Sequence, residues 1–183
     1  MGEESTAPAP SPDYPWYRPV TDGSLEQGDI LFDLPFVSVV SSYDEILQST
    51  ADFEIVYYDA IVLTQSCDLE AGKVDHVVLA PFFSRDELAR TFKGLEKSDG
   101  ERQVQRGRWE SLYLLPPCQM DGIEFGRRIV NFRQVIALPF EIVAEHARRQ
   151  DQRIRFCPPY REHLAQGFAR FFMRIGFPLD FRL

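Results

Sequence analysis

The sequence predicts an α+β protein of one domain, built around a small antiparallel β-barrel. Two observations predict this class. Many short apolar segments, rich in β-branched and aromatic residues, alternate with turn-forming residues, and only one or two segments have helical spacing. Hydrophobic residues make up 44% of the 183 residues and include 15 Phe, which is sufficient for a substantial core.

The first 15 residues, MGEESTAPAPSPDYP, are acidic and rich in Pro, Ala and Ser. This composition predicts a disordered tail, so we expect the barrel domain at 16–183. The tail resembles no secretory signal, and the sequence contains no run of 18 apolar residues. Three cysteines form no framework and are expected to be reduced thiols. We therefore predict a cytoplasmic protein that does not bind membranes.

The first strands are expected on either side of a variable segment. ILFDLPF (30–36) predicts a strand that stops at Pro35. VSVVSSYDEILQSTAD (37–52) indicates a long loop, or a strand with a flexible insertion. EIVYYDAIVLTQS (54–66) predicts two strands separated by a break near Asp59.

The middle of the chain predicts a hairpin followed by an inserted helix. CDLEAGKVD (67–75) has turn chemistry, and HVVLAPF (76–82) is expected to return antiparallel to 60–66. A helix is predicted within 84–112, since Ser84 and Glu87 have the spacing of a capping box. Gly94 and SDGE (98–101) limit the length of this helix.

The last third predicts short strands and a closing helix. Strands are expected at 113–117 and 127–140, a short helix or turn at 141–150, and an edge strand at 153–156. A closing helix at about 160–176 is expected to pack over the barrel, because its apolar residues form one stripe: Leu164, Phe168, Phe171, Phe172 and Ile175.

Charge is distributed unevenly along the chain, whose net charge is −8. Residues 1–100 contain 6 Lys and Arg against 19 Asp and Glu, whereas residues 101–183 contain 14 against 9, and all 14 are Arg. Arg suits phosphate or carboxylate recognition, so a basic face is predicted on a molecule that repels polyanions at long range.

Several segments in order resemble the MazF/PemK plasmid-toxin family: QGDILFDLP, AIVLTQS, VVLAPFFS and FRQVIALP, then the closing helix. The resemblance covers roughly residues 27–178. It implies an SH3-like barrel, sequence-specific cleavage of single-stranded RNA, homodimers and inhibition by an antitoxin peptide.

The sequence departs from this family where the catalytic Arg is expected, since Asp59 and Ala60 stand there. Ser84 best matches the family's catalytic Thr or Ser, and Arg85 follows it. We therefore expect mainly a binding protein in a toxin–antitoxin-like or defence system. The alternative is a single-strand-specific endoribonuclease that uses Ser84 and Arg85.

The segment TQSCD (64–68) offers a further hypothesis. In a regular strand, Thr64, Ser66 and Asp68 share one face and Cys67 lies on the other. Cys67 is then expected to be buried and inert, with Asp68 bonded to the amides of 69–71. The alternative is a thiol enzyme in which Cys67 is a nucleophile and His76 its base.

The site is expected in a groove between strand 30–36, the 67–75 loop and the Ser84–Arg85 loop. The candidate binding residues are Thr64, Ser66, Asp68, Asp29 and Arg133. A zinc site of Cys67, Asp68 and His76 with Cys118 or His146 lacks ligand spacing, and no Gly-rich phosphate loop occurs, so no metal or cofactor is expected. The predicted partners are a protein or antitoxin-like peptide and a second copy of the chain, with RNA as a further candidate.

Overall fold

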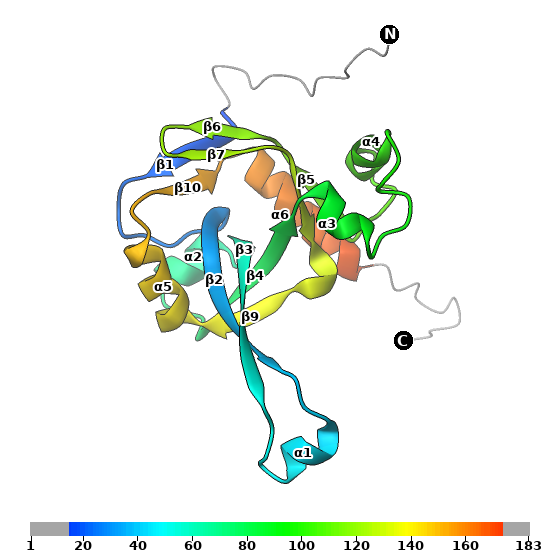
Figure 1. The fold of residues 1–183 in the computed structure, drawn as a ribbon. Coiled ribbons are helices and arrows are strands. Elements are labelled where there is room, and N and C mark those ends of the chain that lie inside the picture. Colours follow the sequence, from blue (N-terminus) through cyan, green and yellow to red (C-terminus); the bar gives the residue numbers. More distant parts are fainter. Residues whose placement is uncertain (1–14, 174–183) are drawn as a thin grey trace, which may run out of the picture.

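The computed structural model describes residues 15–173. The predicted tail, apart from Pro15, and the end of the predicted closing helix with Ile175 lie outside these residues. The described chain is an α+β fold in which every paired strand is antiparallel (Figure 1). The predicted class is therefore confirmed at this level.

Eight strands form an open sheet in the order β1-β10-β2-β3-β4-β8-β5, with β9 paired to β4 off this path. The other two strands, β6 and β7, form a separate hairpin. The strands are β1 Tyr17–Val20, β2 Asp29–Val39, β3 Phe53–Val62, β4 His76–Phe83, β5 Leu112–Leu115, β6 Cys118–Met120, β7 Ile123–Phe125, β8 Arg128–Asn131, β9 Ile136–Pro139 and β10 Arg153–Phe156.

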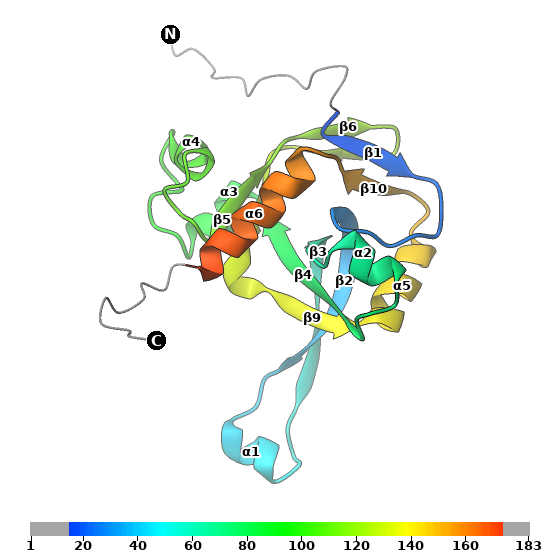
Figure 2. The same cartoon turned by 180° about the vertical axis from the view of Figure 1, so that it is seen from behind.

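Six α-helices and one 3-10 helix connect these strands in the described residues. They are α1 Tyr43–Leu47, α2 Ser66–Glu70, α3 Arg85–Ala89, α4 Gly100–Gln105, the 3-10 helix Phe132–Gln134, α5 Phe140–Arg149 and α6 Tyr160–Phe172. Seen from behind, α6 lies across the sheet beside β5 (Figure 2). Leu164 of α6 is fully buried in the largest core cluster, together with Phe132, Phe156 and Ile30.

Strands β2 and β3 lie where they were predicted, but the predicted end of β2 and the predicted interruption of β3 are wrong. Pro35 does not end β2, which continues to Val39 and pairs Pro35 with Tyr57. Since β10 pairs with β2 only at Asp29 and Ile30, Pro35 lies in a part of β2 that has one neighbouring strand, where a missing N–H is tolerated.

The expected break at Asp59 is instead an irregularity in the opposite strand. Strand β3 is continuous, and the register of β2 shifts between Leu31 and Leu34. Asp33 adopts a positive φ of 49° there, and its amide donates to the Asp59 carboxylate at 3.1 Å.

Beyond this shift the two strands project from the body as a long hairpin with α1 at its tip (Figure 1). We call residues 35–57 the arm. The segment 37–52, predicted as a loop or an insertion, thus contains the end of β2, α1 and the connecting turns.

The predicted pairing of β4 is confirmed, since Ile61 lies opposite Ala80. The Ser84–Glu87 capping box is also confirmed, but α3 contains only five residues and α4 follows separately. The predicted 127–140 strand is divided into β8 and β9 by the 3-10 helix. Strand β10 is not an edge strand, because β1, which was not predicted, pairs outside it. The β6–β7 hairpin was not predicted either.

Candidate functional site

The segment TQSCD does not continue β3, so the surroundings of its side chains differ from those expected in a strand. Strand β3 ends at Val62, and α2 begins at Ser66. Thr64 turns back to the hairpin, where its hydroxyl accepts from the Val78 amide at 2.7 Å. The alternation expected of a strand therefore fails, and Cys67 is exposed rather than buried.

The groups of the thiol-enzyme hypothesis point to different partners. The Cys67 thiol lies 3.7 Å from Gln65 Oε1 and 3.9 Å from Asp68 Oδ1. His76 begins β4 and pairs with Pro139 of β9. Asp68 forms an ion pair with Lys73 at 3.8 Å, in place of the expected bonds to the amides of 69–71. No hydrogen bond within the described residues joins Cys67 to His76, the base of the hypothesis.

Ser84 and Arg85 are engaged in the start of α3. The Ser84 hydroxyl lies 2.6 Å from Glu87 Oε2 and also accepts from the Glu87 amide, as a helix N-cap does. The bonds that the Ser84 hydroxyl and the Ser84 amide donate to the Glu87 carboxyl lower its pKa. Arg85 pairs with Asp86 at 3.4 Å. The Ser84 hydroxyl, which the endoribonuclease hypothesis needs for catalysis, therefore serves to cap α3.

Asp29, a predicted binding residue, is fully buried and forms the centre of an ion-pair network. Arg155 contacts both of its carboxylate oxygens, and Arg153 approaches one of them at 3.6 Å. Burial raises the pKa of Asp29, and the hydrogen bond from Arg155 opposes this shift. Arg155 also contacts Glu26, so one guanidinium holds two carboxylates.

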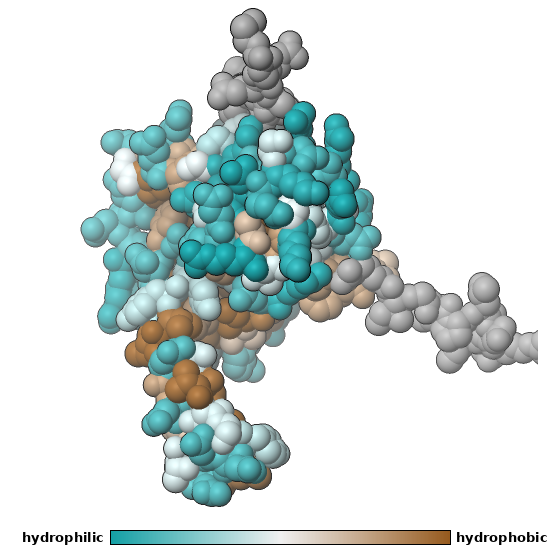
Figure 3. All heavy atoms as spheres, turned by 45° about the vertical axis from the view of Figure 1, so that its right-hand side comes forward, coloured by the Kyte–Doolittle hydropathy of each residue, from teal (hydrophilic) through white to brown (hydrophobic). Residues whose placement is uncertain are grey.

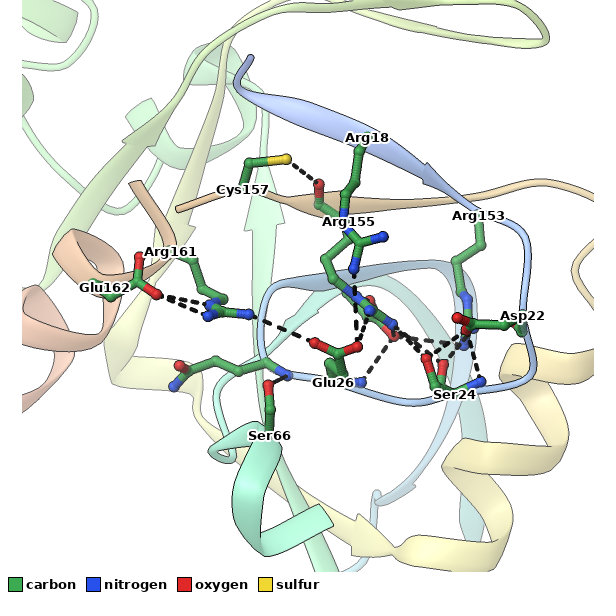
Figure 4. Close-up of polar contacts among 12 residues, drawn as sticks. Arg18, Asp22, Ser24, Glu26, Ser66, Arg153, Arg155, Cys157, Arg161 and Glu162 are labelled. Carbon is green, nitrogen blue, oxygen red and sulfur yellow. Dashed lines mark hydrogen bonds and ion pairs between the residues drawn. The ribbon is translucent and has the colours of Figure 1, made fainter. Parts of the chain in front are cut away.

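The network ties the 24–29 loop to three elements of the fold (Figure 4). Arg153 and Arg155 of β10 donate to the Ser24 carbonyl, and Arg161 of α6 lies 3.6 Å from Glu26. On the other side, the Gln27 amide donates to the Ser66 hydroxyl of α2 at 3.1 Å. Thus Asp29 and Ser66 hold the loop in place, and neither faces an open groove.

Gly28 permits this close approach. Its φ is +87°, and a Cβ at this position would meet the Phe156 carbonyl at 2.8 Å. The Phe156 amide donates to the Gly28 carbonyl at 2.8 Å. The QGD segment therefore serves as the joint between the loop and β10, which requires glycine.

The last predicted binding residue, Arg133, lies in the 3-10 helix, and its guanidinium stacks over the Phe92 ring at 4.8 Å. It is exposed and lies apart from Thr64, Ser66 and Asp68, which belong to the α2 region. The structure therefore does not assemble the predicted binding residues into one site.

A cavity of about 580 Å³ that the sequence did not predict lies between α6, β5 and the segment that follows α4. This volume is within the range of small-ligand sites. Aromatic rings and guanidinium groups dominate its lining, chiefly those of Trp16, Trp109, Tyr113, Tyr160, His163, Arg106, Arg127 and Arg170.

Contacts among the rings fix the wall of this cavity. The Tyr113 and His163 rings meet edge-to-face at 5.7 Å, and the Tyr113 hydroxyl lies 3.3 Å from His163 Nδ1. Phe156 connects Tyr113 and Tyr160 at ring distances of 6.4 and 6.0 Å. Burial raises the pKa of Tyr113, which keeps the phenol neutral.

The cations of the cavity differ in their freedom. Arg127 forms an ion pair with Glu101 at 3.0 Å, which fixes its position. Arg106 at the end of α4 and Arg170 of α6 are both exposed. Flat rings beside guanidinium groups can stack a nucleobase and hold its phosphate. The signal in the sequence was the interleaving of Arg and aromatic residues in RGRWESLY (106–113).

A second cavity of about 590 Å³ lies beside the ion-pair network, between β1, β10 and α5. Its lining mixes polar and apolar side chains in about equal parts and contains no aromatic one. Gln150 and Arg153 each have one buried polar atom there without a hydrogen-bond partner. This cavity therefore offers polar contacts but no stacking surface.

Residues 15–173 contain neither a cluster of metal ligands nor a helix able to span a membrane. No group of three or more His, Cys, Asp or Glu side chains in this range is arranged to hold a metal ion. Likewise, each helix described is too short or too polar to cross a bilayer.

Comparison with known proteins identifies no relative: no family model matches the sequence, and no curated protein matches it significantly.

Proposed function

We propose that this protein binds single-stranded RNA, without cleaving it, in the cavity between α6, β5 and the segment after α4. The observation that carries the proposal is the pairing of stacking rings with arginines in one cavity. Trp109 and Tyr160 offer ring surface to bases, while Arg106 and Arg170 offer charge to phosphates. Single-strand-binding proteins use this combination, because every base has a face that can stack.

Local charge explains how a chain of net charge −8 could hold RNA. The cavity is built from the Arg-rich second half of the chain, whereas the acidic first half contributes only Trp16 to its lining. Contact with phosphate is then favoured locally and screened by salt, while long-range attraction is weak.

Binding is favoured over cleavage because Ser84 and Arg85 do not line the cavity, and because Glu87 engages the Ser84 hydroxyl. We further propose, from the resemblance to the MazF/PemK family, that the curved sheet is an SH3-like barrel. The same resemblance supports a cytoplasmic homodimer in a toxin–antitoxin-like or defence system. Three free cysteines are compatible with that compartment.

Fluorescence anisotropy with a labelled single-stranded RNA of mixed sequence tests the binding proposal. Matched single-stranded DNA and duplex RNA serve as comparison ligands. We expect the single-stranded RNA to bind more tightly than the duplex. Trp109→Leu should weaken binding by about 5- to 160-fold, because a stacked base contributes about 1–3 kcal/mol.

The arginines are tested separately from the rings. Arg106→Ala and Arg170→Ala should each lower affinity and reduce the salt dependence by about one phosphate contact. Arg149→Ala is the matched control, since Arg149 is an exposed arginine of α5 outside the cavity. Equal binding of duplex and single strand, or no binding, would refute the proposal. Cleavage of the RNA, abolished by Arg85→Ala, would establish the endoribonuclease alternative instead.

A further inference from the structure

We propose that one face of the arm is a docking site for a basic amphipathic segment of a partner protein. This inference is independent of the proposed RNA site, which lies at the other end of the molecule. Figure 3 shows the feature that motivates it: hydrophobic residues gather on the arm, where it leaves a largely hydrophilic body.

The apolar face follows from the register of β2 and β3. Three pairs of residues lie directly opposite each other on this face: Pro35 and Tyr57, Val37 and Ile55, Val39 and Phe53. Because side chains alternate along a strand, these six lie on one side of the hairpin. Val37, Ile55 and Phe53 are 69%, 61% and 63% exposed.

The tip of the arm extends this surface. Helix α1 buries none of its residues, and Tyr43, Ile46 and Leu47 are all exposed. With Val40 and the strand residues, nine large apolar side chains of the arm are at least 44% exposed. Large exposed apolar patches are uncommon on monomeric proteins and mark interaction sites, and about 800 Å² on each partner suffices for a specific complex.

No strand of the described body pairs with the arm, and only its base packs against the core, through Phe36 and Val56. β4 pairs with β3 only from Ala60 to Val62, and β10 pairs with β2 only at Asp29 and Ile30. An isolated two-stranded hairpin is marginally stable in water. A partner that covers the apolar face would therefore both remove that face from water and stabilise the arm.

The charges of the arm indicate which partner fits. Carboxylates flank the apolar face at both ends, with Asp33 and Asp59 at the base and Asp44, Glu45 and Asp52 near the tip. The sequence has no Lys or Arg between Arg18 and Lys73. Nucleic acids and anionic membranes would be repelled. Two arms packed face to face would also bring carboxylates together, in either direction. A segment with apolar residues flanked by Lys or Arg would match both the apolar face and the carboxylates at its ends.

The experiment uses the full chain and two fluorescein-labelled helical peptides of about 18 residues, roughly the 27 Å needed to follow the arm. One peptide has a leucine face and a lysine face, and the other replaces every Lys with Glu. We expect the Lys peptide to bind and the Glu peptide not to bind. Binding should weaken with salt.

Matched variants locate the binding. Val37→Thr with Ile55→Thr keeps two β-branched residues and the net charge, and it should weaken Lys-peptide binding by about tenfold or more. Ile142→Thr is the control, because Ile142 is an exposed apolar residue of α5 outside the arm, and its affinity should equal that of the wild type. Circular dichroism verifies that each variant is folded.

Three results would overturn the proposal. The first is equal binding of the Lys and Glu peptides, and the second is unchanged affinity in the Val37→Thr, Ile55→Thr variant. The third is a wild-type dimer in sedimentation that this variant abolishes, because a second copy would then occupy the arm. RNA binding by the same variant should be unchanged, which separates this test from that of the RNA site.

Discussion

Arg155 and Asp29 lie opposite each other in neighbouring strands and form a paired ionic contact, although the arginine is 1% exposed and the carboxylate not at all. Arg155 comes from β10 and Asp29 from the start of β2. Contacts of this kind are costly to break, because the remaining partner keeps its charge without water or a counterion.

Asp29→Asn should therefore destabilise the protein by about 3–5 kcal/mol. The substitution keeps the shape of the side chain but removes the charge that Arg155 and Arg153 share. Urea unfolding followed by circular dichroism measures the change. Glu26→Gln is the control and should cost less, since Glu26 is partly exposed. An equal loss in both variants would contradict the central role of Asp29.

Asp59→Asn should stabilise the protein at neutral pH by up to about 1 kcal/mol, limited by its partial exposure. Burial raises the pKa of the Asp59 carboxyl, the hydrogen bond from the Asp33 amide opposes this shift, and the charge of the Asp33 carboxylate adds to it. The folded state thus binds the proton more tightly, so stability falls as pH rises through the range between the unfolded and folded pKa values. The Asn side chain can still accept from the Asp33 amide.

The advantage of Asp59→Asn should disappear when the pH falls below the ordinary pKa of an aspartate. Thermal melting of both proteins across the acid range provides the measurement. A variant that is less stable than the wild type at neutral pH would show that the charge of Asp59 favours the folded state.

The three cysteines should react in a fixed order. Cys67 is exposed, whereas Cys118 and Cys157 are buried, and burial raises the pKa of both buried thiols. Iodoacetamide at neutral pH should modify Cys67 in the native protein and the other two only after unfolding. Peptide mass spectrometry identifies the sites. Modification of Cys118 as fast as Cys67 in folded protein would contradict this order.

Ser84→Ala should cost about 1 kcal/mol, because α3 loses both bonds of its capping box. RNA affinity should not change, since Ser84 lies outside the cavity. Ser42→Ala is a useful comparison, because the same capping box starts α1 at the tip of the arm. If Ser84→Ala lowered RNA affinity without changing stability, Ser84 would have a function in RNA binding.

Local patterns predicted the local features of this fold. The spacing of Ser84 and Glu87 correctly predicted the start of a helix, and the apolar run after His76 correctly predicted β4. The failures arise where tertiary contacts decide. Pro35 is tolerated because one side of its strand has no neighbour, and Cys67 is exposed because the chain turns at Leu63 to form α2.

The segment 106–113 carried a local signal, but the cavity as a whole could not be predicted, because it joins distant segments. Trp16 precedes β1, Trp109 follows α4, and His163 lies in α6. No spacing within the sequence brings these residues together. Asp29 was predicted as a binding residue, but its structural role could not be predicted. The two arginines that pair with it lie more than a hundred residues away in the sequence.

The pairing of β1 with β10 has a consequence for synthesis of the chain. Tyr17 lies opposite Phe156, and Ile30 of β2 lies opposite Ile154. During translation, neither strand can find this neighbour until β10 has left the ribosome. Contacts so distant in sequence also slow folding, because a long loop must close first. Apolar segments of a nascent chain would thus wait uncovered, and chaperones that hold such segments would be expected to raise its yield.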